Sequence, residues 1–297
     1  MKLEIANSPC SWGVAYPDAP GNPESKKVFK EIAEAGYKFS ELGPYGYLPT
    51  DPKEILDLMD SIKLKIIGSF IFDNLHIESE HDRIKKTIRN ICALLEKINS
   101  KVFVIIDHIT KERMETSGNQ TLSVSLKNND YKKMINFIDE ISNMCFEKFG
   151  IVPVLHPHAG SYIEYEFEID RVFNDVKSDH LALCLDTGHL YYCKVDPYKA
   201  ILKYKNKIKH IHFKDINQNI LNTIYRDKID FDTAVKMGVF CPLGKGVIDF
   251  KTVYKNLNSI SYNGYATIEQ DIDPNEGLNP IEYAKKSLAY LNNLKQV

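Results

Sequence analysis

The stretch LALCLDTGHLYYCKVDPYKAILKYKNKIKHIHFKD, from Leu181 to Asp215, decides the fold. It contains two short apolar runs, Leu181–Asp186 and Ile208–Phe213, each of a length that suits a buried strand. The helical pattern Pro197–Tyr204 lies between them, and Asp196-Pro197 starts it with an acidic cap and a proline at the first helical position. A strand, a helix and another strand in this order are the unit from which parallel sheets are built.

The same alternation runs through the rest of the chain. Eight apolar runs that suit strands alternate with eight helical patterns, and no Gly/Ser-rich linker or change in composition interrupts them. The pattern predicts an α/β fold, a single (β/α)₈ TIM barrel over residues 1–297. The expected strands are Leu3–Ala6, Lys38–Leu42, Leu64–Ile71, Lys101–Asp107, Ile151–His156, Leu181–Asp186, Ile208–Phe213 and Tyr265–Gln270. The expected helices are Glu24–Ala35, Pro52–Ile62, Asp82–Ile98, Tyr131–Phe149, Phe167–Val176, Pro197–Tyr204, Phe250–Ile260 and Pro280–Leu294.

A doubly wound open sheet is the alternative fold. Such a sheet usually carries a glycine-rich turn after its first strand, and Asn7-Ser8-Pro9-Cys10-Ser11-Trp12-Gly13 lacks that fingerprint. Two long connections, residues 109–129 and 214–246, follow the fourth and seventh expected strands. In a barrel both lie over the end where substrates bind, so they are candidate lids.

Composition excludes several classes of protein. Of 297 residues, 43% are apolar and 11% aromatic, which excludes intrinsic disorder. Apolar runs such as Val102–Ile106 are far shorter than the roughly 20 residues of a membrane-spanning helix. The near balance of 38 Lys+Arg against 40 Asp+Glu argues against dedicated nucleic-acid binding. The absence of a signal-peptide pattern, and six cysteines without a CxxC pair, predict a cytoplasmic protein with reduced thiols.

Acidic and histidine side chains stand at the carboxyl ends of the expected strands. In a barrel these ends meet at one mouth, and five of the nine histidines follow three consecutive strands. Carboxylates mixed with imidazoles, without cysteine, suit a divalent cation such as Mn²⁺, Co²⁺, Mg²⁺ or Zn²⁺ better than a closed structural zinc site. Asp186, His212 and Glu269 come from three successive strands, and we expect them to converge on one ion.

Each of these side chains also has a purely structural interpretation. A single histidine after a strand is often only hydrogen-bonded, which is our interpretation of His210, and we take His212 as the inward-facing member of that pair. Asp186 could cap a turn, and His189 could be structural. Gly244-Lys245-Gly246 lacks the full spacing of a phosphate-binding loop.

Seven short segments carry a family resemblance over essentially the whole chain. They are Asn7-Ser8-Pro9-Cys10-Ser11-Trp12-Gly13, Glu41-Leu42-Gly43-Pro44-Tyr45-Gly46-Tyr47-Leu48-Pro49, His156-Pro157-His158-Ala159-Gly160, Asp186-Thr187-Gly188-His189, His212-Phe213-Lys214-Asp215, Pro242-Leu243-Gly244-Lys245-Gly246 and Glu269-Gln270-Asp271. Together they resemble the inosose dehydratase branch of the xylose-isomerase-like barrels. The Asp-Thr-Gly-His, His-x-Lys-Asp and final-strand Glu elements are shared by sugar isomerases, epimerases and dehydratases of that superfamily. The segment from Glu41 and the His-Pro-His segment favour the dehydratase branch.

The resemblance implies one divalent metal ion held by four side chains, with Mn²⁺ or Co²⁺ preferred over Zn²⁺ or Mg²⁺. Its last three ligands correspond to Asp186, His212 and Glu269. The first comes from the fifth strand, where many relatives have His-Asn-His closely followed by Glu. This chain has His156-Pro157-His158, with Glu164 further along. We expect Glu164 to be this ligand, with His156 or His158 as the substitute.

The resemblance also implies a reaction, the dehydration of a keto-polyol such as 2-keto-myo-inositol through an enediolate. A base removes the proton next to the ketone, the metal stabilises the oxyanion, and an acid assists the departing β-hydroxyl. His158, Glu41 and Lys214 are the candidates for acid and base, with their roles not assigned. The expected substrate-binding residues are Trp12, Tyr45, His156 and His189.

The segment after the first strand differs from that of typical inosose dehydratases, and this difference leaves the identity of the substrate open. Inosose dehydratases of inositol degradation typically begin with Ala-Pro-Ile-Gly-Trp-x-Asn, whereas this chain has Ser8-Pro9-Cys10-Ser11-Trp12-Gly13. The alternative function is a metal-dependent isomerase or epimerase of a ketose, which shares the enediolate. A DNA-repair endonuclease needs further His and Glu ligands and a basic groove, and a non-catalytic barrel needs no metal. The expected partner is an uncharged polyol or sugar, with no nucleic acid and no membrane; homo-oligomerisation stays open.

Overall fold

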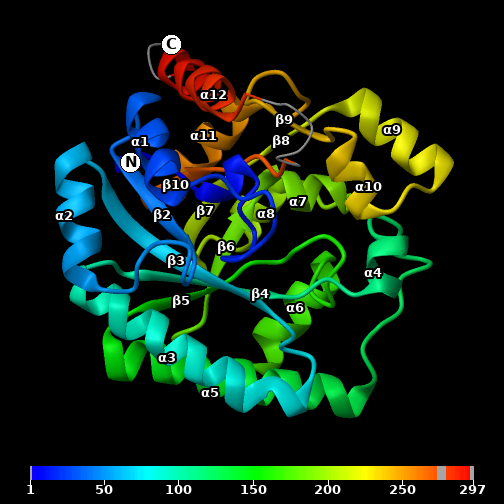
Figure 1. Ribbon diagram of the computed structural model, residues 1–297. Helices are drawn as coiled ribbons and strands as arrows, with labels where there is room; N and C mark the ends of the chain where they lie inside the picture. The colour runs from blue at the N-terminus through cyan, green and yellow to red at the C-terminus, as the bar shows by residue number, and fades with distance from the viewer. Residues whose placement is uncertain (1, 273–278, 295–297) are drawn as a thin grey trace.

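A closed barrel of eight parallel strands forms the centre of the computed structural model, which describes residues 2–272 and 279–294 (Figure 1). Strands adjacent in the barrel follow the order of the sequence, and β1 closes it by pairing with both β2 and β10. The expected (β/α)₈ fold is confirmed. The barrel strands are β1 (Lys2–Asn7), β2 (Phe39–Pro44), β3 (Lys65–Asp73), β4 (Val102–Asp107), β5 (Val152–Leu155), β6 (Ala182–Asp186), β7 (Ile208–Phe213) and β10 (Asn263–Ile268).

The eight expected helices surround this barrel, each within three residues of its expected boundaries. The last of them packs beside the first, where the Tyr37 hydroxyl donates to the carbonyl of Ala284 at 2.9 Å (Figure 1). None of the helices within residues 2–272 and 279–294 has the length and apolar character needed to cross a bilayer. These helices are α1 (Ser25–Glu34), α2 (Pro52–Ile62), α3 (His81–Lys97), α5 (Asn128–Phe149), α6 (Glu166–Asp175), α8 (Pro197–Lys203), α11 (Phe250–Ser259) and α12 (Pro280–Leu294).

Local sequence explains where these helices begin and which face they bury. The carboxylates of Asp51 and Asp196 each accept two backbone N–H groups at the start of α2 and α8, and a proline follows both. Each cap of this kind stabilises a helix by about 1 kcal/mol. Along α3, Ile84, Ile88 and Ile91 recur at helical spacing and are fully buried against the barrel.

Two apolar clusters stabilise the barrel. The larger lies between the strands and the surrounding helices, and a smaller one, which includes Phe70, Val104 and Cys184, fills the interior. Residues two apart on a strand share a face, so Cys184 points into the barrel like Asp186, which follows it by two. The interior is therefore packed with side chains up to the layer where the polar residues begin.

Both long connections contain short elements that the sequence pattern did not predict. The first carries α4 (Lys111–Thr116), and the second carries the strand pair β8 (Asp215–Ile216) and β9 (Phe240–Cys241) with α9 (Gln218–Asp227) and α10 (Phe231–Lys236). A further helix, α7 (Thr187–Tyr192), follows β6 directly, and single 3₁₀ turns occur at Pro9–Trp12 and Glu78–Glu80. In Figure 1, α4 and α10 lie side by side. Six-residue helices are too short to show a clear period of 3.6.

Candidate active site

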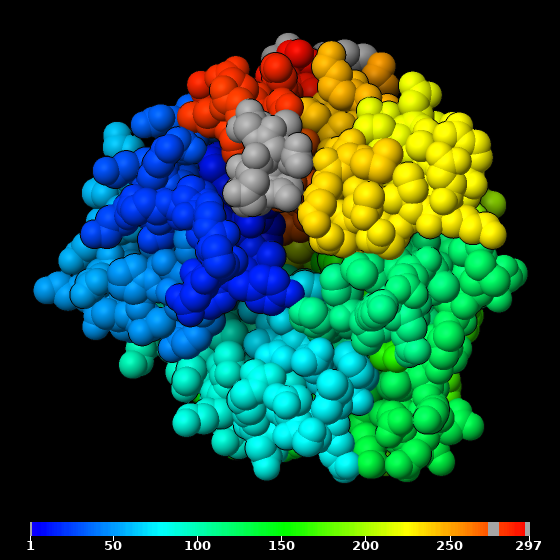
Figure 2. Space-filling view, turned by 45° about the vertical axis from the view of Figure 1, so that its right-hand side comes forward, coloured from blue at the N-terminus to red at the C-terminus, as the bar shows by residue number. Residues whose placement is uncertain are grey.

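A cavity of about 290 Å³ opens at the carboxyl ends of the barrel strands, the end that carries the active site in TIM barrels. Figure 2 shows a hollow on this face, bordered by the blue N-terminal segment, the green segment after β4 and the yellow α9–α10 region. We call its imidazole and charged side chains near the strand ends the polar wall, and its aliphatic and aromatic side chains the apolar wall. The polar wall consists of His156, His158, His189, His212, Lys214, Glu269 and Asp271. The apolar wall includes Phe70, Phe72, Ile106, Ile109, Phe231, Val235 and Ile272.

Four buried side chains form one compact group on the polar wall. His156 follows β5, Asp186 ends β6, His212 lies in β7 and Glu269 follows β10; one ligand atom from each lies within 4.8 Å of the others. His156 Nε2 is 3.4 Å from Asp186 Oδ2, and His212 Nδ1 is 3.1 Å from Glu269 Oε2. Two imidazoles and two carboxylates from four strand ends could hold a divalent cation.

The two carboxylate oxygens of Asp186 have different surroundings. Oδ1 accepts the backbone N–H groups of Gly188 and His189, both at 2.8 Å, and so caps α7. Oδ2 is buried without a hydrogen-bond partner and faces the group. Burial opposes ionisation, but the ammonium of Lys214 and the nearby imidazoles outweigh it and hold the pKa of Asp186 well below its ordinary value. Asp186 therefore serves as a helix cap and also offers a free anionic oxygen to a cation.

The imidazole of His212 also directs one nitrogen at this group of four side chains. Its Nε2 lies 3.0 Å from Glu41 Oε1, so Nε2 carries the proton and Nδ1 presents a lone pair to Glu269 and Asp186. Two electron-rich atoms this close need a positive charge between them, which a proton or a metal ion supplies. Burial lowers the pKa of His212, but Cys184, Glu269 and Glu41 outweigh burial and raise it well above its ordinary value. The donor set therefore fits a divalent cation.

Glu41 lies below this group and does not line the cavity, so the structure does not support the catalytic role expected for it. Its Oε1 accepts hydrogen bonds from Nε2 of His210 at 2.8 Å, Nε2 of His212 at 3.0 Å and Oγ1 of Thr267 at 2.7 Å. A carboxylate behind a metal-binding imidazole fixes its tautomer and orientation. Both His210 and His212 face the interior because residues two apart on a strand share a face, so the expectation that only His212 points inward is wrong.

Glu164, expected as the first metal ligand, lies outside the four-residue group. Its Oε1 accepts the hydroxyl of Ser117 and the N–H of Gly118, both at 2.8 Å. Its Oε2 accepts the N–H of Gly160 at 3.1 Å and a guanidinium N–H of Arg113 at 3.3 Å. Both oxygens are thus occupied, and Glu164 shares the buried guanidinium of Arg113 with Glu168. The alternative left open by the sequence, His156, takes the position next to Asp186.

We expect Glu164→Gln to destabilise the protein without removing bound metal. The amide NH₂ would face backbone N–H donors, and Arg113 would lose one of its buried anions, which costs about 3 kcal/mol of unfolding free energy. Urea denaturation and the metal content of the dialysed protein measure the two effects. A folded variant that has lost its metal would restore Glu164 as a ligand.

Trp12 and Tyr45 follow strands at the correct end of the barrel, but the structure does not place them in the cavity. The Trp12 indole is 3% exposed, and its N–H donates to Glu31 Oε2 at 2.7 Å. Tyr45 packs against the larger apolar cluster. From the same connection after β1, Tyr16 lines the cavity instead and donates its hydroxyl to His108 Nε2 at 2.6 Å. Nothing in the sequence distinguished Tyr16 from the other tyrosines.

A second polar cluster surrounds Lys214. Its ammonium lies 2.9 Å from Asp271 Oδ2 and 3.1 Å from His189 Nε2. Burial lowers the pKa of Lys214, but Asp186, Asp271 and Glu269 outweigh burial and raise it above its ordinary value, so Lys214 stays charged. Burial and the Lys214 charge lower the pKa of His189 to about 4, so His189 stays neutral. Asp271 belongs to the segment Glu269-Gln270-Asp271, but its contact with Lys214 could not be predicted from the sequence.

His158 is arranged as a base on the cavity wall. Its Nδ1 lies 2.8 Å from the carbonyl oxygen of Ala159, so Nδ1 carries the proton and Nε2 the lone pair. Burial and then the neighbouring imidazoles of His189 and His156 lower the pKa of His158 well below its ordinary value. The side chain is therefore neutral at physiological pH, as a general base must be.

The loop that contains Gly244-Lys245-Gly246 binds a carboxylate of the chain itself. Asp215 Oδ2 accepts the N–H groups of Gly244 at 2.9 Å and Gly246 at 3.0 Å, and Oδ1 accepts that of Ile248 at 3.0 Å. A Cβ at Gly246 would lie 2.3 Å from Asp215 Oδ1, so only glycine fits there. These N–H groups are therefore not free for a phosphate.

Comparison with known proteins adds to this picture. The sequence profile of a family described as xylose isomerase-like TIM barrel matches residues 29–294. Inosose dehydratase of Lacticaseibacillus casei is 28% identical over 98% of this chain and 97% of its own length. Inosose dehydratase of Clostridium perfringens is 29% identical over 98% of this chain and 96% of its own length. The solved structure of the IolI protein with a binding zinc atom superposes with a TM-score of 0.73 at 15% identity, covering 99% of this chain and 98% of that one, which shows a shared fold.

Proposed function

The chain belongs to the xylose isomerase-like TIM barrel family, and from this premise we propose that it is a metal-dependent lyase that dehydrates 2-keto-myo-inositol or a closely related keto-polyol. The observation that carries the proposal is the buried group of two imidazoles and two carboxylates at the barrel mouth. The choice of dehydration is supported by the full-length similarity to inosose dehydratases. Such a reaction belongs to inositol degradation, and the six free cysteines suit the reducing cytoplasm.

His156, Asp186, His212 and Glu269 are the residues that would hold the cation. Carboxylate and imidazole donors suit Mn²⁺ or Co²⁺, with Zn²⁺ or Mg²⁺ as alternatives, and a zinc atom in the similarly folded IolI protein supports a cation in this fold. When bound, the cation would polarise the ketone and stabilise the negative charge that develops on its oxygen. Glu41 would hold the Nε2–H of His212, so that Nδ1 is the nitrogen directed at this position.

We assign the base to His158 and a fixed positive charge to Lys214. The lone pair of His158 Nε2 takes the proton from the carbon next to the ketone, which leaves an enediolate. The ammonium of Lys214, held by Asp271, stabilises that anion and stays protonated throughout. The imidazolium of His158 then returns its proton to the departing β-hydroxyl, so that one water molecule leaves and the residue regains its starting state.

The apolar wall indicates how the substrate lies. Phe70 and Phe72 from β3, Ile106 from β4 and Phe231 from α10 line the same cavity as the polar wall. The rings of Phe72 and Phe231 lie directly beside that of His158, with centroid distances of 5.2 and 5.7 Å. A cyclic polyol presents hydroxyl groups at its edge and C–H groups on its faces. We propose that its ketone and neighbouring hydroxyl meet the polar wall while C–H groups pack on the aromatic rings.

The test follows α-proton exchange and product formation together. We expect the protein, stripped of metal and reloaded with Mn²⁺ or Co²⁺, to incorporate deuterium from D₂O into 2-keto-myo-inositol and to produce an ultraviolet-absorbing enolised diketone. The metal-free protein is the control and should do neither. Exchange without diketone would move the assignment to an epimerase or isomerase, and a panel of ketohexoses would then identify the substrate. No exchange with any keto-polyol would contradict enolisation altogether.

A further inference from the structure

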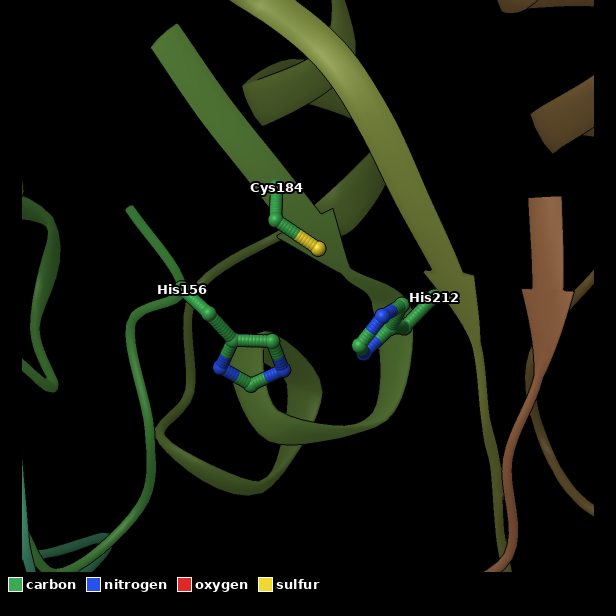
Figure 3. A group of neighbouring side chains, drawn as sticks. All are labelled: His156, Cys184 and His212. Atoms are coloured by element: carbon green, nitrogen blue, oxygen red, sulfur yellow. The ribbon is translucent and has the colours of Figure 1, made fainter. Parts of the chain in front are cut away.

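Below the four-residue group, a thiol approaches two of its imidazoles. Cys184 lies in β6 two residues before Asp186, on the same inward face and one layer deeper in the barrel. Figure 3 shows its sulfur directed toward the space between the rings of His156 and His212. One ligand atom from each of the three lies within 4.8 Å of the others, and all three residues are at most 2% exposed.

This deeper triad offers different donor chemistry from the group at the mouth. The two sets share His156 and His212, but the mouth adds carboxylate oxygens from Asp186 and Glu269, whereas the triad adds a sulfur. Hard cations such as Mn²⁺ and Mg²⁺ prefer oxygen ligands, and thiolates select softer ions such as Cd²⁺ and Zn²⁺.

One ion cannot use both sets at once. With metal–ligand bonds of about 2.0–2.3 Å, two ligands of a single ion lie at most about 4.6 Å apart. Among the residues described, no group within 4.8 Å joins Cys184 to Asp186 or Glu269. The two sets are therefore alternatives, and an ion that moves toward the sulfur must leave the carboxylates.

We propose that His156, Cys184 and His212 form a second, deeper cation site that selects thiophilic ions and competes with the site at the mouth. Two buried ring nitrogens support this assignment, because Nδ1 of His156 and Nδ1 of His212 have no hydrogen-bond partner and both residues belong to both sets. The bond from Cys184 to the cation forms as the thiol releases its proton to solvent. A soft ion seated here occupies both shared imidazoles and displaces a hard ion from the carboxylates.

Cys10 provides a matched control for this experiment. It also lines the cavity, but it belongs to none of the potential metal-binding groups found among the described residues. The full chain, metal-free, is titrated with Cd²⁺ while the thiolate-to-cadmium absorption in the near ultraviolet is recorded for wild type, Cys184→Ser and Cys10→Ser. A parallel titration with Mn²⁺, followed by electron paramagnetic resonance, measures the affinity for a hard ion.

We expect one absorbing Cd²⁺ per chain in wild type and in Cys10→Ser, and no absorption in Cys184→Ser. Cd²⁺ affinity should fall at least about tenfold in Cys184→Ser while Mn²⁺ affinity changes less than about threefold, because only the soft-ion site loses a ligand. Cd²⁺ should also release bound Mn²⁺ from wild type.

Three outcomes would overturn the proposal: absorption that persists in Cys184→Ser, absorption lost in Cys10→Ser, or no absorption in wild type. Circular dichroism of Cys184→Ser and Cys184→Ala checks that both fold. The titrations use metal ions alone, so their result is independent of whether the substrate is a keto-inositol.

Discussion

Asp186→Ala is expected to abolish binding of the divalent cation and to lower turnover by about 10³-fold or more. The substitution removes a buried anionic oxygen, Oδ2, that lies 3.4 Å from His156 Nε2 and 3.5 Å from Lys214 Nζ. It also removes the cap of α7, which costs about 1 kcal/mol of stability. Metal analysis of the dialysed protein and the diketone assay measure the two expected losses.

Asp186→Asn separates these two roles of the side chain. Its amide oxygen can still accept the N–H groups of Gly188 and His189, so the cap of α7 is kept while the negative charge is lost. We expect Asp186→Asn to be more stable than Asp186→Ala because it keeps this cap, and both Asp186→Asn and Glu269→Ala to lose most of the bound metal. Full metal occupancy in Asp186→Ala or Glu269→Ala would contradict the site.

The part of the site that could be predicted from the sequence is the part that lies on strands. Asp186, His212 and Glu269 stand at or next to the last residue of a strand, so the barrel alone brings them together. Glu164 lies beyond the end of β5, in an irregular segment where strand periodicity gives no direction. That segment turns its side chain to Arg113 instead of the mouth.

Side-chain direction explains the other differences between the site expected from the sequence and the site in the structure. Trp12 and Tyr45 follow strands in sequence, but their backbone has left the strand and turns the rings into the layer between barrel and helices. Glu41 does face inward, one layer too deep to reach a substrate. Phe231 comes to the cavity on a helix of six residues, which no periodicity in the sequence reveals.

His158→Asn is expected to lower kcat by about 10²- to 10⁴-fold while the bound metal stays in place. The variant removes the lone pair at Nε2 and leaves all four residues of the metal-binding group intact. Deuterium exchange at the α-carbon should fall with kcat because both need the same proton abstraction. Metal content and kcat, measured on the same sample, separate loss of the base from loss of the cation.

His108→Asn is the matched control for this variant. Like His158, His108 donates its Nδ1 proton to a neighbouring carbonyl, that of Ile109 at 2.8 Å, but its Nε2 already accepts the hydroxyl of Tyr16. Its imidazole thus has no lone pair for a substrate, and the described cavity lining does not include it. We expect kcat of His108→Asn to fall by less than about tenfold, well short of the loss of a general base.

The pH profile distinguishes a base from a residue that only shapes the cavity. The base must be unprotonated, and its pKa is lowered by burial and by His189 and His156, a direction that a nearby cation reinforces. With the metal saturating, kcat should therefore stay level as the pH falls through about 6.5, where an ordinary histidine is half protonated, and decline only below it. His158→Asn should lose this acid limb. A limb that survives in His158→Asn, or a wild-type midpoint at or above about 6.5, would assign the base to another residue.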